Sequence, residues 1–137
     1  MVLPQRLTAE ESFPFVPPVL AAAAAAYQLA RVAESAQLAL MAQQELDDEW
    51  SDDVRALVLR ARERIYETQQ SRTALRDRVR EFVTGLRESG DSASSVIDHS
   101  RSMIRLLEST GVITSDDGRL EAEVVAWATE DCRPPEA

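Results

Sequence analysis

A heptad repeat in the middle of the chain constrains the fold most. From Val54 to Leu86, the residues at alternating steps of four and three are mainly apolar, and no proline falls within the repeat. Such spacing is typical of one long helix that buries a single stripe, in a coiled coil or a bundle. The a positions are Val58, Ile65, Arg72, Val79 and Leu86, and the d positions are Val54, Ala61, Thr68, Leu75 and Phe82. The polar step Thr68–Arg72 interrupts the stripe midway and is expected to fix its register.

The positions that flank this stripe carry arginine and no acid. The e positions include Arg55, Arg62 and Arg76, and the g positions include Arg64 and Arg78. Two copies of the helix would set arginine against arginine in either orientation. Each exposed contact of this kind costs only roughly a few tenths of a kcal/mol, but several together decide partner choice. We therefore expect the helix to pair with an acidic partner and not with itself. An arginine-rich solvated face is the alternative, because arginine stems also cover apolar surface.

Charge is distributed unevenly along the chain, whose net charge is −9 and whose fifteen basic residues are all arginine. Residues 51–90 carry a net +2, whereas residues 1–50 carry −5 and residues 91–137 carry −6. The two acidic segments can therefore supply charge partners for the arginine-edged helix within one fold. A GC-biased coding sequence accounts for the absence of lysine, and escape from lysine-directed modification is the alternative.

The stretch from Ser12 to Ala30 carries no charged side chain, which raises the question of a membrane helix or a secretion signal. A membrane helix needs about twenty mostly apolar residues, but prolines break the first third of this stretch and alanine gains little in lipid. A secretion signal needs basic residues before its apolar run, where this chain has Glu10 and Glu11. Both interpretations are weaker than that of a soluble helix.

The soluble interpretation has local support. Pro17 and Pro18 suit the first turn of a helix, where a missing N–H costs nothing, and Ala21–Ala26 continue it with the best helix former. Apolar residues then recur at steps of three and four, which indicates an apolar face: Leu29, Ala33, Ala36 and Leu40. The preceding residues, with Phe13, Phe15 and Val16, are expected to form an extended arm laid over an apolar surface.

We predict an all-α fold, an antiparallel bundle of about four helices with one long heptad-patterned central helix. The helices are expected at roughly 18–46, 52–88, 95–109 and 119–130. The predicted division is an extended arm (1–17), a helical bundle domain (18–131) and a polar tail (132–137). Ser51 is the expected N-cap of the second helix, and Ser92, Ser94 or Ser95 that of the third.

The end of the third helix is predicted from Gly111. This glycine is expected to take the left-handed conformation after the helix, with Val112 touching Leu107 as in a Schellman motif. Residues 112–120 then form either a hairpin around "DDG" or a turn into a final helix. We favour the helix, because Leu120, Val124 and Trp127 share one helical face.

Few residues could carry chemistry. The chain has one histidine, His99, and one cysteine, Cys132. The neighbours of His99, Asp98 and Ser100, point in other directions on a helix and form no triad. The acidic run Asp47–Glu49 could suggest a calcium loop, but it lacks the glycine and the alternating spacing of an EF-hand. We expect no enzyme activity, no cofactor and no metal. A single cysteine suits a reducing compartment, so we expect a cytoplasmic location.

The segment "SSVIDHSRSMIRLLESTGVITSDDGRL" resembles the recognition helix and wing of a winged-helix regulator. The resemblance covers about a fifth of the chain and implies DNA binding. The charge opposes it, because a DNA-binding surface needs a basic footprint and residues 91–137 are acidic.

The function expected from the sequence is a non-enzymatic protein–protein interaction module: an adaptor, an assembly subunit or an accessory factor. The alternatives are a winged-helix-like regulator and a secreted helical effector. The expected partner is a protein with an acidic helical surface, not nucleic acid or a membrane, and a homo-oligomer stays open. The candidate partner-binding residues are Phe13, Phe15, Val16, Arg62, Arg64, Arg76, Arg78 and Trp127.

Overall fold

A computed structural model of the protein describes residues 16–44 and 52–133, and within them the chain is all-α. Its helices are α2 (Pro18–Gln44), α3 (Asp52–Glu88), α4 (Ala93–Ser109) and α5 (Arg119–Asp131). The predicted all-α fold class is confirmed, and no strand occurs in these two ranges. Three predictions lie outside them: the arm with Phe13 and Phe15, the acidic run with the Ser51 cap, and the end of the polar tail.

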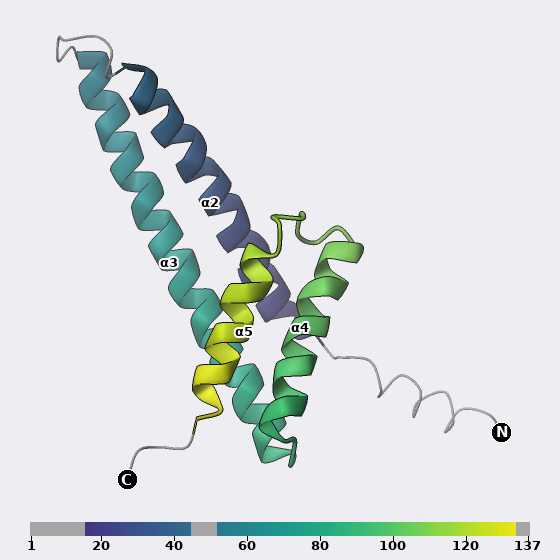
Figure 1. The fold of residues 1–137 in the computed structure, drawn as a ribbon. Coiled ribbons are helices and arrows are strands. Elements are labelled where there is room, and N and C mark those ends of the chain that lie inside the picture. The colour runs from purple at the N-terminus through teal and green to yellow at the C-terminus, as the bar shows by residue number, and fades with distance from the viewer. Residues whose placement is uncertain (1–15, 45–51, 134–137) are drawn as a thin grey trace.

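The long helices α2 and α3 lie side by side, and their contacts show that they run in opposite directions (Figure 1). The Thr68 hydroxyl donates to the Ala30 carbonyl at 3.2 Å, and the Gln37 amide approaches the Leu57 carbonyl at 3.5 Å. The helices α4 and α5 pack against one end of this pair, formed by the start of α2 and the end of α3 (Figure 1). We call residues 32–43 of α2 and 52–66 of α3, beyond α4 and α5, the open half.

The hydrophobic core lies at the other end, where all four helices meet. Each large apolar side chain that is fully buried there contributes about 1.5–3 kcal/mol to stability. The core residues are Leu20, Ala24, Tyr27, Leu75, Val79, Val83, Val96, Met103, Ile104, Leu107, Ile113, Leu120, Val124, Trp127 and Ala128. Ile113, in the connection between α4 and α5, closes the core from that side.

The heptad stripe of α3 is buried only in part. Ala61, Leu75 and Val79 are buried, whereas Ile65, an a position in the open half, is 37% exposed. Val83, which lies outside the a and d positions, is buried as well. The C-terminal helices α4 and α5 widen the buried face of α3 at the end where they pack, which we call the closed end. In the open half only α2 lies beside α3 among the described helices, so Ala61 is buried while Ile65 stays partly exposed.

The apolar face predicted for α2 is not the face that packs. Leu29 is 71% exposed and Leu40 is exposed as well, although the spacing predicts that they belong to one apolar face. The buried positions are instead Leu20, Ala24 and Tyr27 towards the core, with Gln37 against α3. Because alanine makes most faces of α2 apolar, the apolar pattern does not select the face that packs.

The helix ends follow local sequence signals. The Ser92 side chain accepts a hydrogen bond from the Ser95 N–H at 3.1 Å and caps α4. Gly111 is left-handed (φ 80°), and the Val112 N–H donates to the Leu107 carbonyl at 3.0 Å, which is the predicted Schellman bond. Ile113, and not the exposed Val112, then enters the core.

The connection between α4 and α5 is a turn into a helix, as we favoured, and not a hairpin. Asp117 and Gly118 are both left-handed, and the Asp116 carboxylate accepts a hydrogen bond from the Leu120 N–H at 3.1 Å. This bond satisfies a free N–H at the start of α5. Since residues 112–118 contain no strand, the wing implied by the winged-helix resemblance is not present in this segment.

Candidate functional site

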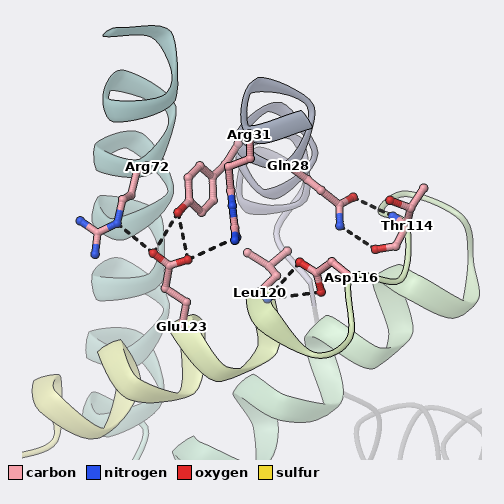
Figure 2. Close-up of polar contacts among 8 residues, drawn as sticks. Gln28, Arg31, Arg72, Thr114, Asp116, Leu120 and Glu123 are labelled. Carbon is pink, nitrogen blue, oxygen red and sulfur yellow. Dashed lines mark hydrogen bonds and ion pairs between the residues drawn. The ribbon is translucent and has the colours of Figure 1, made fainter. Parts of the chain in front are cut away.

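One carboxylate, Glu123 of α5, joins three helices at the edge of the core (Figure 2). Each of its oxygens lies 2.9 Å from the Tyr27 hydroxyl, which donates to it from α2. The Arg72 Nε of α3 donates to it at 2.8 Å, and the Arg31 guanidinium of α2 lies 3.5 Å away. Hydrogen bonds to a charged group are stronger than neutral ones, so this cluster fixes where α5 sits on the α2–α3 pair.

A second polar contact holds the connection between α4 and α5 against α2. The Gln28 amide nitrogen donates to the Thr114 carbonyl at 2.6 Å, and the Thr114 N–H donates to the Gln28 amide oxygen at 2.7 Å (Figure 2). Both polar ends of one buried side chain are therefore satisfied by a single loop residue. The pairing anchors the loop that carries Ile113 into the core.

The third contact involves two of the predicted partner-binding residues, Arg76 and Trp127. Arg76 donates to both carboxylate oxygens of Asp131, at 2.8 and 2.7 Å. Trp127 is only 6% exposed, and the guanidinium carbons of Arg72 and Arg76 lie 5.2 and 5.8 Å from its ring centroid. Arginine over an aromatic face is a favourable cation–π arrangement. Trp127 is therefore a core residue of this chain, which corrects its expected place on a binding surface, and Arg76 is bound to α5.

The other predicted residues have different environments. Arg64 pairs with Glu67 at 3.1 Å and Arg78 with Glu81 at 3.0 Å, each on the exposed surface of α3. Arg62 is exposed and forms no ion pair within the described ranges. Val16 is half-buried and packs against the core. Phe13 and Phe15 lie outside the described residues, so their predicted role stays untested.

Sequence reasoning missed the residues that join the helices: Tyr27, Gln28, Glu123 and Asp131. The available signal was the charge distribution, since it indicated that the acidic C-terminal segment could pair with the arginines of α3. It did not indicate which carboxylates do so, because α5 carries acids on more than one face.

The surroundings of Tyr27 predict an alkaline effect on stability. Burial, and then the hydrogen bond to Glu123, raise the pKa of Tyr27 above its ordinary value of 10.0. The unfolded chain has the ordinary pKa and the folded chain has the raised one. At a pH between the two, the folded chain keeps a proton on Tyr27 that the unfolded chain releases. The contribution of Tyr27 is thus fully present below about pH 10 and is lost as the pH rises through the folded pKa.

We therefore expect the free energy of unfolding to fall more steeply between pH 9 and 11 in the wild type than in Tyr27→Phe, as measured by urea unfolding. The two proteins differ only at this position, so the difference between their two slopes isolates the contribution of Tyr27. Equal slopes would contradict the raised pKa.

The surroundings of His99 do not assemble a proton relay. Its Nδ1 lies 3.4 Å from the Ser95 hydroxyl and 3.5 Å from the Asp91 carboxylate. A Ser–His–Asp relay uses the two different ring nitrogens, and here one nitrogen faces both groups. Ser100, next in sequence, is buried and donates to the Val96 carbonyl.

The described ranges contain no group of histidine, cysteine and acidic side chains placed to hold a metal ion. Within the same ranges, none of the helices has the length and apolar character needed to cross a membrane.

The open half is the part of the described α2–α3 pair that α4 and α5 do not cover. Large apolar side chains are exposed there on α2 (Val32, Leu38 and Leu40) and on α3 (Leu59, Ile65 and Tyr66), and Leu29 of α2 is exposed just outside it. Exposed arginines accompany them on α3, and Arg55, Arg60 and Arg62 form no ion pair with another described residue. Clustered exposed apolar residues mark interaction surfaces far more often than isolated ones do. The open half is therefore the candidate functional site.

In comparisons with known proteins, no protein-family model, no curated protein and no solved structure matches the chain.

Proposed function

We propose that this protein is a non-enzymatic interaction module whose open half binds an acidic helical surface of another protein. The observation that carries the proposal is the exposure of large apolar side chains there, such as Val32 at 62%. At the closed end the same two helices bury large apolar residues in the core that they share with α4 and α5, although Val19 of α2 is exposed there as well. Two paired helices bury only their facing sides, and a third or fourth helix is what usually covers the rest.

Charge supports an acidic partner. Where α3 meets α5, its arginines Arg72 and Arg76 bind Glu123 and Asp131. Arg55 and Arg62 have no such acid among the described residues. Acidic side chains on a partner would supply what these arginines lack, whereas a second copy facing the same surface would bring further arginines.

A cytoplasmic location is part of the same proposal. The single cysteine, Cys132, is a free thiol at the end of α5. A lone thiol suits a reducing compartment.

The proposal is tested by affinity capture with the tagged full chain from its native source. The wild type is compared with Val32→Glu and Leu59→Glu, which each place one negative charge in the open half. Thr84→Glu is the matched control, because it adds the same charge at an exposed position of α3 near the closed end. We expect one protein to co-purify with the wild type and the control, and its recovery to fall about tenfold or more in an open-half variant.

The captured protein must also bind the purified chain directly, and its affinities for the variants must follow the same order as its recovery. Equal recovery with all four proteins, or no partner that survives purification, would overturn the proposed function. Circular dichroism checks that each variant keeps the wild-type helix content, which we expect because all three positions are exposed.

A further inference from the structure

The contact of α5 with α2 and α3 shows what kind of helix packs against these two long helices. Helix α5 presents Leu120, Val124 and Trp127 to the core, and its acids Glu123 and Asp131 reach the arginines of α3. Arg72 is an a position of the heptad and Arg76 is an e position. The side of α3 that carries its a and e positions is thus the side that receives an acidic amphipathic helix.

The same side continues into the open half with the same residue types. Residues seven apart lie on nearly the same face of a helix, with a drift of about 20° per heptad. Ile65 lies two heptads before Val79, and Arg62 lies two heptads before Arg76. Val58 and Arg55 lie one heptad earlier still. The apolar and arginine positions that α5 covers at the closed end therefore recur in the open half, where Val58 is half-buried, Ile65 is 37% exposed and neither Arg55 nor Arg62 pairs with a described acid.

Helix α2 contributes to this side as well. Arg31 of α2 reaches Glu123 of α5, so the residue seven positions later, Leu38, lies on nearly the same face. Leu38 is 43% exposed. We call the surface formed by Leu38, Val58, Ile65, Arg55 and Arg62 the α5-side face.

We infer that the α5-side face binds an acidic amphipathic helix of another protein, with apolar residues at steps of three and four flanked by acids, as in α5. This inference rests on the proposed function and specifies its partner and its face. Two observations select this occupant: the face is continuous with the surface that already holds α5, and Arg55 and Arg62 have no acidic partner among the described residues. From Arg55 to Ile65, α3 rises about 15 Å, so a partner helix of about three turns would cover it.

The opposite side of α3 in the open half also carries an exposed arginine, which allows a matched control. Arg60 is exposed and forms no ion pair in the described ranges, like Arg62. Because they are two residues apart on a helix, however, Arg60 and Arg62 point in directions about 160° apart. Arg62→Glu and Arg60→Glu therefore make the same charge change in the same turn of α3, and only the first lies on the α5-side face.

The probe is a synthetic helix with the chemistry of α5. It consists of two tandem copies of the sequence of residues 120–130, acetylated, amidated and labelled with fluorescein, so that acids flank an apolar stripe over its whole length. Fluorescence anisotropy measures its binding to the full-length chain at low salt. A second peptide, with every glutamate replaced by glutamine, tests the need for acidic charge.

We expect saturable binding that weakens about tenfold in Arg62→Glu, equivalent to roughly 1.4 kcal/mol, and changes less than about twofold in Arg60→Glu. The glutamine peptide should bind about tenfold more weakly than the acidic one, and salt should weaken only the acidic peptide strongly. Binding that responds equally to both arginine substitutions, or to neither, would overturn the inference, since the peptide would then lie elsewhere or replace α5.

Three further results would overturn the inference in distinguishable ways. If the peptide does not bind while a native partner is captured and is lost in Val32→Glu, the proposed function stands and the partner uses another face of the open half. If light scattering shows a dimer that Ile65→Glu makes monomeric, a second copy of the chain occupies the α5-side face. Absence of both peptide binding and a native partner would remove the inference together with the proposed function.

Discussion

Trp127→Ala should destabilise the protein by about 3–5 kcal/mol, the range for truncating a buried tryptophan. The side chain is 6% exposed, it packs in the core among residues of all four helices, and two guanidinium groups lie over its ring. Its removal leaves a cavity between α5 and α3 and takes away the cation–π contacts with Arg72 and Arg76. Because small domains are stable by only about 5–15 kcal/mol, a large share of the total would be lost.

The measurement is urea unfolding followed by far-ultraviolet circular dichroism, which does not depend on the fluorescence of the tryptophan that is removed. Leu106→Ala on α4 is the control, since Leu106 is exposed, and we expect it to cost less than about 1 kcal/mol. A loss below about 1 kcal/mol in Trp127→Ala would show that α5 does not depend on this residue for its position.

Leu20→Ala and Leu29→Ala should have very different effects, although both remove the same atoms from the same helix. Leu20 is fully buried in the core, so its truncation should cost about 2–5 kcal/mol. Leu29 is exposed, so its truncation should change stability by no more than about 0.5 kcal/mol. Urea unfolding of the two variants, with the wild type, measures the difference directly.

This pair also tests which face of α2 packs. If Leu29→Ala were as costly as Leu20→Ala, the apolar spacing from Leu29 to Leu40 would mark a buried face after all. A small effect in Leu29→Ala would leave this residue free to serve a partner.

The positions of the helices could be predicted because their signals are local. Pro18 suits a first turn, Ser92 caps α4 with its own side chain, and Gly111 adopts the left-handed conformation that most other residues avoid. Each acts within about one helical turn, whatever the rest of the chain does. The predicted ranges 52–88 and 119–130 consequently agree with α3 and α5 to within one residue.

The charge pattern predicted less about the candidate site. It indicated that the arginines of α3 would seek acids, and Arg72 and Arg76 do bind acids of α5. It did not separate Arg76 from Arg55 and Arg62, which occupy the same e position of the heptad. That separation depends on how far α5 reaches along α3, which no local signal encodes.

The sequence by itself thus determined where α3 and α5 begin and end and that α3 is edged with arginine, because propensity and capping act between near neighbours. Only the tertiary structure decided which face of α2 is buried, since an alanine-rich helix is apolar on most sides. It also decided that Glu123 meets Tyr27 and that Thr114 meets Gln28, across 96 and 86 residues of chain. Contacts at such separations exist only after α4 and α5 have docked, and the same docking leaves the open half uncovered among the described residues.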